Sequence, residues 1–453
     1  MDAERASKAM DRARADKRAL PQKRRAQAED GKAARPERPP AAKHGRAPKP
    51  VRIPITNLFG AKDYSASIKV GSNGAIVHAI LDTGSSMFAV DPKAYDGTKD
   101  TDLVKTTLAQ TVRYAPGGWA GPVVRTSIAL GSTILRDCPV AIASLQAPDN
   151  FAGGTGVLGL AYAALNDDYD MKSFLATNGG AQSSYPWPLG SDDWTTESAK
   201  FQSLIQSGQL PKGSLPTYFD LLEGAGIVAN KFAFHVRRSW VSLVSADPTT
   251  DPLNQGVFVL GGGEEERDLY EGEFRDVAVL DDMYYNTHLV AVRVGDLPAV
   301  AAAPLPAKYL ATERTNSVID TGTNDLALAS DVHDAVLKGL GKLNPKFASL
   351  IQQAQALRQQ NQGLPVSELD LAAWPDLHFM LTGANGTDVT LTCKPSTYWQ
   401  VDFPKKGVAL FQIDQSPDEI SQTVLGLPLL NNYYTVFDRS KDAKGIVRFA
   451  QIK

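Results

Sequence analysis

From Ile53 onward, short apolar runs alternate with turns rich in Gly, Asp and Asn. Many runs are rich in β-branched residues and alternate apolar with polar positions, which predicts strands in antiparallel sheets. Four such runs lie at 64–70, 76–81, 256–260 and 288–294. Helix-like segments are few, and they lie at 217–229, 331–340 and 345–360. The pattern therefore indicates an all-β fold with few short helices.

One β-unit occurs twice in the chain. The segment 79–86 reads Ala-Ile-Leu-Asp-Thr-Gly-Ser-Ser, and 317–324 reads Ser-Val-Ile-Asp-Thr-Gly-Thr-Asn. Each is followed later by two apolar residues and a glycine, at 157–159 and 424–426. Internal repetition of this kind predicts two duplicated lobes, each supplying one aspartate. Ligand sites favour the interface between domains, so we expect a shared site in a central cleft.

The two Asp-Thr-Gly units suggest a specific chemistry. Asp82 and Asp320 each follow a strand, and the glycine after each lets another backbone approach closely. If the loops meet, two carboxyl groups that close cannot both ionise cheaply, so one holds a proton while the other is ionised. Such a pair can activate a water molecule and polarise a carbonyl group. A single Asp-Thr-Gly would indicate only a turn, and it is the second copy that argues against this.

Composition argues against several classes of protein and of site. The chain has 453 residues, of which 43% are hydrophobic and 21% charged, as in soluble globular proteins of two or three domains. No apolar run approaches the roughly 18 residues of a membrane-spanning helix, so we expect no membrane span. Two cysteines exclude a disulfide framework, and six scattered histidines argue against a histidine-based metal site. We expect no metal and no cofactor.

The N-terminal segment differs from the rest. Residues 1–50 carry 15 Lys and Arg against 7 Asp and Glu, in front of an acidic body. We expect a disordered basic tail, with an inhibitory propiece as the alternative. Nucleic-acid binding is disfavoured, because no aromatic residues interleave the basic ones. No apolar segment of a secretory signal follows the charges, which favours a cytoplasmic location with secretion left open and with Cys138 and Cys393 reduced and buried.

From Tyr64 to the C-terminus, the sequence resembles the pepsin-like aspartic peptidases. Besides the two Asp-Thr-Gly units, 114–121 resembles the flap hairpin that closes over substrate. The segments 156–162, 424–428 and 433–438 are similar to later strands of that family. The missing signal and disulfides resemble its bacterial, intracellular branch. The resemblance implies a bilobal pepsin-like fold, with a tail at 1–52, an N-terminal lobe at 53–250 and a C-terminal lobe at 251–453.

The resemblance also implies residue roles. Asp82 and Asp320 would be the catalytic dyad. Tyr114 and Gly117 would lie in the flap and contact substrate. The loop residues that support the dyad would be Thr83, Gly84, Ser85, Thr321, Gly322 and Thr323. Of these, the threonines at 83 and 321 would bond across the lobes, and the hydroxyls at 85 and 323 would bond the outer carboxylate oxygens.

The implied function is that of a pepstatin-sensitive acid protease, an endopeptidase that hydrolyses proteins. An extended peptide would bind by strand-like hydrogen bonds. The alternative is a catalytically silent pepsin-like binding protein, because a fold does not guarantee activity. We expect a monomer, since both aspartates already lie on one chain.

Several positions depart from the family pattern. Ala89 stands where a tryptophan usually orients the flap tyrosine, and Trp119 could substitute for it. Asn324 replaces a small hydroxyl residue, and Leu427 replaces a common acidic one. The segment 163–215 contains an insertion, for which base rates favour a surface loop, with a cleft-rim element as the alternative.

Overall fold

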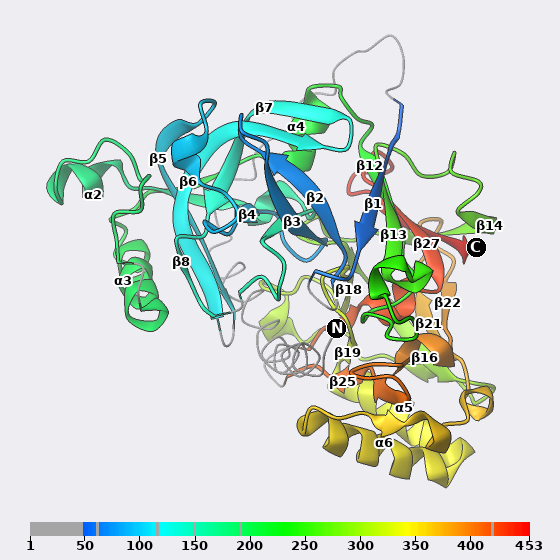
Figure 1. Ribbon diagram of the computed structural model, residues 1–453. Coiled ribbons are helices and arrows are strands. Elements are labelled where there is room, and N and C mark those ends of the chain that lie inside the picture. The colour runs from blue at the N-terminus through cyan, green and yellow to red at the C-terminus, as the bar shows by residue number, and fades with distance from the viewer. Residues whose placement is uncertain (1–48, 60–62, 115–116, 149, 191–192, 418–420) are drawn as a thin grey trace.

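A computed structural model describes residues 49–59, 63–114, 117–148, 150–190, 193–417 and 421–453 (Figure 1). Most of the regular structure in these ranges is β. Residues 1–48 of the tail expected at 1–52 lie outside the described residues.

The largest sheet takes strands from both halves of the chain. Its strands from the first half are β1 (Val51–Thr56), β2 (Ser65–Val70), β3 (Ala75–Asp82), β4 (Phe88–Val90), β5 (Val104–Tyr114), β6 (Gly117–Leu130), β7 (Thr133–Ile142), β8 (Leu145–Gln146), β9 (Gly156–Gly159), β10 (Asp167–Asp170), β11 (Lys212–Ser214) and β12 (Lys231–His235). Its other strands are β13 (Gln255–Leu260), β14 (Tyr270–Ala278), β27 (Tyr433–Asp438) and β28 (Ile446–Ile452). The order is β11-β10-β5-β6-β7-β4-β9-β3-β2-β1-β13-β12-β27-β28-β14, with β8 beside β6.

Three smaller sheets belong to the second half. The first has the order β15 (Asn286–Thr287), β18 (Ser317–Ile319), β26 (Thr423–Leu425), β19 (Leu326–Leu328) and β25 (Ile413–Gln415). The second has the order β17 (Val300–Ala301), β16 (Leu289–Val294), β21 (Leu377–Leu381) and β22 (Val389–Cys393). The third joins β20 (Leu364–Pro365), β24 (Val408–Phe411) and β23 (Trp399–Val401).

The predicted duplication is visible in the strand pairing. In the first half, β3 runs parallel to β9, β9 antiparallel to β4, and β4 parallel to β7. In the second half, β18 runs parallel to β26, β26 antiparallel to β19, and β19 parallel to β25. The two halves thus repeat one four-strand arrangement in the same order. This confirms the predicted all-β, two-lobed fold.

The helices are α2 (Lys172–Thr177), α3 (Trp194–Gln206), α4 (Tyr218–Gly224), α5 (Ser330–Leu343), α6 (Pro345–Gln359), α7 (Pro395–Tyr398) and α8 (Leu427–Leu430). Helix α4 begins at a capping box, in which Thr217 and Asp220 each bond the other's backbone amide. Helix α6 begins at Pro345 behind the N-cap Asn344, at the start of the predicted helix-like segment 345–360. These and α5 correspond to the three helix-like segments of the sequence.

The insertion within 163–215 is a folded element rather than a surface loop. It contains β10, α2, α3 and β11, and β10 joins the edge of the large sheet at β5. Figure 1 shows α2 and α3 on the outer side of β5 and β6, away from α5 and α6. The expectation that 163–215 forms a surface loop is therefore wrong, because this segment has enough apolar residues to pack against the sheet.

Strands from distant parts of the chain share one core at the middle of the large sheet. Strand β12 pairs with β27, and the rings of Phe232 and Phe437 stack with their centroids 5.1 Å apart. Strand β13 pairs with both β1 and β12. The division into 1–52, 53–250 and 251–453 stays a prediction, and the described part of the chain has its first strand at Val51.

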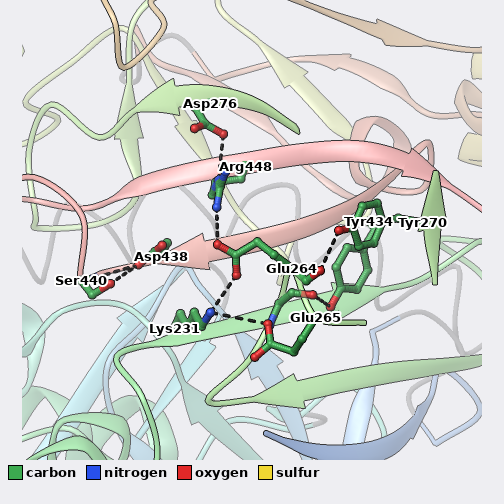
Figure 2. Close-up of polar contacts among 10 residues, drawn as sticks. Lys231, Glu264, Glu265, Tyr270, Asp276, Tyr434, Asp438, Ser440 and Arg448 are labelled. Atoms are coloured by element: carbon green, nitrogen blue, oxygen red, sulfur yellow. Dashed lines mark hydrogen bonds and ion pairs between the residues drawn. The ribbon is translucent and has the colours of Figure 1, made fainter. Parts of the chain in front are cut away.

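A network of charged side chains lies on this shared part of the sheet (Figure 2). Arg448 on β28 contacts Glu264 and, through its Nε, donates to Asp276 on β14 at 2.9 Å. Lys231 on β12 lies 2.7 Å from the carboxylate of Glu264. Because these groups are partly shielded and each has an opposite charge nearby, the pKa values of Lys231 and Arg448 are raised even though burial opposes their charge. The network joins strands of both halves.

Candidate active site

Asp82 and Asp320 occupy equivalent places in the two halves. Asp82 is the last residue of β3, and Asp320 directly follows β18. Both side chains are buried, with 3% of their surface exposed. Parallel strands β9 and β26 run beside β3 and β18, so each aspartate leaves its sheet at the same kind of edge.

The fold brings the two carboxylates together over a pair of glycines. A methyl group added to Gly322 would lie 2.4 Å from Asp82 Oδ1 and 3.4 Å from Asp320 Oδ1. A methyl group added to Gly84 would lie 2.6 Å from Asp320 Oδ2. Each carboxylate therefore lies against the glycine of the other loop, where a larger residue would not fit.

Hydrogen bonds within each loop set the orientation of its carboxylate. The amide of Gly84 donates to Asp82 Oδ1 at 2.8 Å, and the hydroxyl of Ser85 donates to Asp82 Oδ2.

The second loop repeats this arrangement. The amide of Gly322 donates to Asp320 Oδ1 at 2.9 Å, and the hydroxyl of Thr323 donates to Asp320 Oδ2 at 2.8 Å. Both carboxylates are thus held by one amide and one hydroxyl from their own loops.

Thr83 and Thr321 join the two loops by a reciprocal exchange of hydrogen bonds. The amide of Thr83 donates to Thr321 Oγ1 at 3.0 Å, and the amide of Thr321 donates to Thr83 Oγ1 at 2.9 Å. The two hydroxyls donate in turn to backbone carbonyls of the opposite half, at Ile319 and Leu81. Both threonines are buried, so these bonds are shielded from water and tie the halves at the site itself.

The apolar-apolar-Gly segments support the loops from behind. A methyl group on Gly426 would lie 2.3 Å from the carbonyl oxygen of Thr323, and one on Gly159 would lie 2.5 Å from Ser86 backbone atoms. The amide of Leu427 donates to that same carbonyl of Thr323 at 2.8 Å. The glycines allow β9 and β26 to approach the loops this closely.

The structure adds supporting residues to the second loop that the sequence pattern did not indicate. Asn324 donates to Asp63 Oδ1 at 2.8 Å, which links the loop to the first half of the chain. The buried guanidinium of Arg358 on α6 bonds Asp325 at 3.0 Å and lies 3.5 Å from Asp414. Burial opposes its charge, but the two carboxylates more than offset this and raise its pKa.

No motif of the sequence connects these partners. Arg358 lies 33 residues after Asp325, at the far end of a helix. The sequence indicated only that Asn324 departs from the family pattern, and it did not indicate Asp63 as the partner of Asn324.

The hairpin of β5 and β6 ends where the sequence places the flap. Tyr114 and Gly117 are the last residue of β5 and the first of β6, and they lie opposite one another. The side chain of Tyr114 lies outside the described residues. Trp119 is 1% exposed and packs in one apolar cluster with Ala89 and Val112, so it is part of the core. That Trp119 takes the place of the tryptophan that usually orients the flap tyrosine stays a prediction.

Neither a metal cluster nor a membrane-spanning helix is found in the described part of the chain. Across those ranges, no three His, Cys, Asp or Glu side chains are arranged to hold a metal ion. No helix among them is both long and apolar enough to cross a membrane. Cys138 and Cys393 are buried free thiols, and burial raises the pKa of Cys393 to about 12.

Comparisons with known proteins agree with this geometry. The family model "Eukaryotic aspartyl protease" matches residues 244–452. The chain is 21% identical over 415 residues to "Probable vacuolar protease A" of Arthroderma benhamiae, covering 87% of this chain and 80% of that protein. It is 20% identical to pepsin A of Gallus gallus, covering 87% and 86%, and 21% identical to the vacuolar aspartic protease of Candida albicans, covering 87% and 76%.

The expected cytoplasmic location is wrong. The relatives from A. benhamiae and C. albicans are named vacuolar proteases, a class that is vacuolar or secreted. The expectation relied only on the missing apolar segment behind the N-terminal charges, and that pattern does not decide the compartment. These relatives are eukaryotic, and none of them supports the finer resemblance to bacterial intracellular homologues.

Proposed function

We propose that Asp82 and Asp320 are the catalytic dyad of this chain, which is a pepsin-like aspartic endopeptidase. The observation that carries the assignment is the close approach of each carboxylate to the glycine of the other loop. The threonine bonds across the halves support it, because they hold the two loops at that separation. Gly84, Ser85, Gly322 and Thr323 then act as the residues that orient the dyad.

The proposed reaction needs one proton shared between the two carboxyl groups. Two like charges facing each other in a buried site cannot both persist, and aspartic proteases are the standard example of this principle. The ionised carboxylate accepts a proton from a water molecule, whose oxygen attacks the peptide carbonyl carbon. The protonated carboxyl donates a hydrogen bond to the carbonyl oxygen as negative charge develops there. Collapse of the tetrahedral intermediate breaks the C–N bond, and the leaving amine takes up the proton that the carboxylate had accepted from water, which restores the dyad.

The substrate is a protein or peptide in extended conformation. The hairpin ending at Tyr114 and Gly117 would cover it and offer backbone groups for strand-like hydrogen bonds. Because both aspartates belong to one chain, a monomer suffices for this chemistry. We propose neither a nucleic acid nor a membrane as a partner.

The lobes and the tail follow the division made from sequence. In this proposal 1–52 is a tail or an inhibitory propiece, and 53–250 and 251–453 are the two lobes. Arg52 on β1 contacts Glu266 and Asp268 in the turn between β13 and β14, which supports a body that begins near β1. A chain lacking 1–48 should report the role of the tail: faster cleavage supports a propiece, and an unchanged rate supports a passive tail.

The test is cleavage of an unfolded protein between pH 3 and 7, with and without pepstatin. Asp82→Asn and Asp320→Asn remove an ionisable group at nearly constant volume. Each is expected to lower the rate by about 10²–10⁴-fold or more, the usual contribution of general acid–base groups. Circular dichroism and thermal melts establish that the variants fold. Full-length and truncated wild-type protein that both fail to cleave would favour the silent binding protein instead.

A further inference from the structure

A groove of about 800 Å³ lies on the second half of the chain, apart from the paired aspartates. It is bounded by β14, β16, the hairpin of β21 and β22, and the turn between β27 and β28. Figure 1 shows β14, β16, β21 and β22 on the side of the molecule away from α2 and α3. None of the residues that line this groove belongs to either Asp-Thr-Gly loop. Its own side chains therefore have to indicate what it could bind.

A row of polar side chains crosses three strands at one end of the groove. Arg293 on β16 lies opposite His378 on β21, and His378 lies opposite Thr392 on β22. Residues that are opposite one another on neighbouring strands share one face of the sheet. His378 Nδ1 lies 3.0 Å from the hydroxyl oxygen of Thr392. The neighbours of His378, Leu377 and Phe379, are buried on the other face, so the row belongs to the outer face of this sheet.

Two arginines at this end of the groove lack a close carboxylate. The guanidinium of Arg293 lies 3.8 Å from Asp296, whose side chain is fully exposed to solvent. Arg275 on β14 donates to the carbonyl of Thr390 on β22 at 2.9 Å, which holds its guanidinium at the edge of the groove. Across the described ranges, Arg275 makes no ion pair. Exposed pairs at such long distances contribute little, so both positive charges remain available to a ligand.

The other groups at this end leave that positive charge in place. Asp276 also lines the groove, but Arg448 donates to its carboxylate at 2.9 Å and offsets its charge (Figure 2). Burial, and to a smaller extent Arg293, hold the pKa of His378 below its usual range. The imidazole is therefore neutral at pH 7. It offers a hydrogen bond beside the two arginines without adding charge of its own.

The charge of the groove changes along β22. Asp388 lines the groove directly before this strand, four residues before Thr392, which is roughly 13 Å in an extended strand. Lys441 and Asp442 line it from the turn before β28, and as neighbours in sequence they offset each other's charge. Apolar surface in the lining comes from Phe274, Val389 and Ile446. The groove is thus positive at the arginine end, negative near Asp388, and partly apolar.

We propose that this groove binds an acidic segment of an extended polypeptide, with its carboxylates beside Arg275 and Arg293. Arginine pairs well with carboxylates, and the imidazole and hydroxyl of the polar row supply further hydrogen bonds. The volume and the apolar surface offer contacts that a free inorganic anion cannot make, which favours a polypeptide. Asp388 repels further acidic residues, so the segment continues with neutral or basic ones. That the segment belongs to protein substrates rests on the proposed function, whereas binding itself does not.

The test is binding of the capped peptide Glu-Glu-Leu-Ala-Lys-Ala to the Asp82→Asn protein, which avoids cleavage. The ring resonances of His378, assigned with His378→Gln, report binding at the groove itself. We expect a saturable shift that is lost when both glutamates of the peptide are replaced by glutamine. Arg293→Gln should weaken binding by about three- to tenfold, as the loss of one partly shielded ion pair does. The matched control is Arg136→Gln on the exposed side of β7, which should leave binding unchanged.

Cleavage measures the part of the inference that concerns substrates. In the protein with an intact dyad, Arg293→Gln should raise KM for an unfolded protein that carries the acidic segment. It should leave kcat, and KM for a short neutral peptide, unchanged, because the groove takes no part in the chemistry. Arg275→Gln is the second variant, and it probes the same end of the groove if Arg293→Gln does not fold.

Three results would overturn the groove as a polypeptide site. They are the absence of a saturable shift up to about 5 mM peptide, where even weak specific binding would show, equal binding of the glutamate and glutamine peptides, and a response of His378 to inorganic phosphate but not to the peptide. Because the binding measurement needs no catalysis, a protein that binds the peptide and cleaves nothing would overturn the proposed function and still support the groove.

Discussion

The guanidinium of Arg358 lies 3.0 Å from the carboxylate of Asp325, five residues beyond Asp320. Arg358 is 8% exposed and also donates to the carbonyl of Phe411 at 2.7 Å. An interaction between a helix and the second aspartate loop thus depends on a buried charge. Removing one partner of such a pair leaves the other uncompensated.

Arg358→Met should therefore destabilise the protein by about 3–5 kcal/mol, because the partly buried Asp325 and Asp414 would lose this cation. The free energy of unfolding in urea measures the change. Arg358→Lys keeps a charge without the forked geometry and should lose less. Equal stability of the wild type and Arg358→Met would contradict the role assigned to this contact.

Thr321→Val should weaken the connection between the two loops. The substitution keeps the shape of the side chain and removes the hydroxyl that accepts from the buried Thr83 amide, which costs about 1–3 kcal/mol. Thr321→Ser retains the hydroxyl and serves as the control. Thermal melts and kcat/KM should both fall for the valine variant and change little for the serine variant. A valine variant with wild-type activity would argue against the cross-loop bonds as positioning contacts.

Gly322→Ala should impair catalysis more than folding. The added methyl would lie 2.4 Å from Asp82 Oδ1, so the carboxylate must move, and a displacement of about 1 Å can cost roughly 100-fold in rate. Gly341→Ala on α5 is the control, because its methyl would meet only Ala348 Cβ at 3.7 Å. We expect kcat/KM to collapse in the first variant and to stay unchanged in the second.

Asp168 on β10 should make the insertion more stable in acid. Burial, together with Asp167 and Asp170, raises the pKa of Asp168 to about 6. Lys212 on β11 lies 3.0 Å from Asp167 in this group of carboxyls. Since the folded state holds the proton more tightly than the unfolded one, stability is greatest below the unfolded value near 3.8 and declines as pH rises to about 6.

The variant Asp168→Asn should remove this dependence. Its stability relative to the wild type should rise between pH 4 and 7 by about 2–3 kcal/mol, the equivalent of a shift of roughly two pKa units. Urea unfolding at several pH values provides the measurement. Parallel pH profiles of the wild type and the variant would show that Asp168 does not titrate as its burial suggests.

Much of the site follows from local sequence. Each aspartate loop consists of an apolar strand followed directly by Asp-Thr-Gly, so the turn, the glycine and the hydroxyl are neighbours in sequence. Both loops can therefore be identified from the sequence alone. The alternation of apolar and polar residues likewise specifies the strands that lead into them. The expected location was wrong because a missing signal pattern is a weaker observation than a motif that is present.

The chain by itself determined the strands, the duplication and the two aspartates, because each depends on residues that are neighbours in sequence. Tertiary structure alone decided that Arg358 pairs with Asp325, that Gln110 bonds Asn166, and that the insertion covers β5 instead of forming a loop. These contacts join residues 33 to 62 positions apart. They depend on how whole elements pack, and no short pattern encodes which distant surfaces will meet.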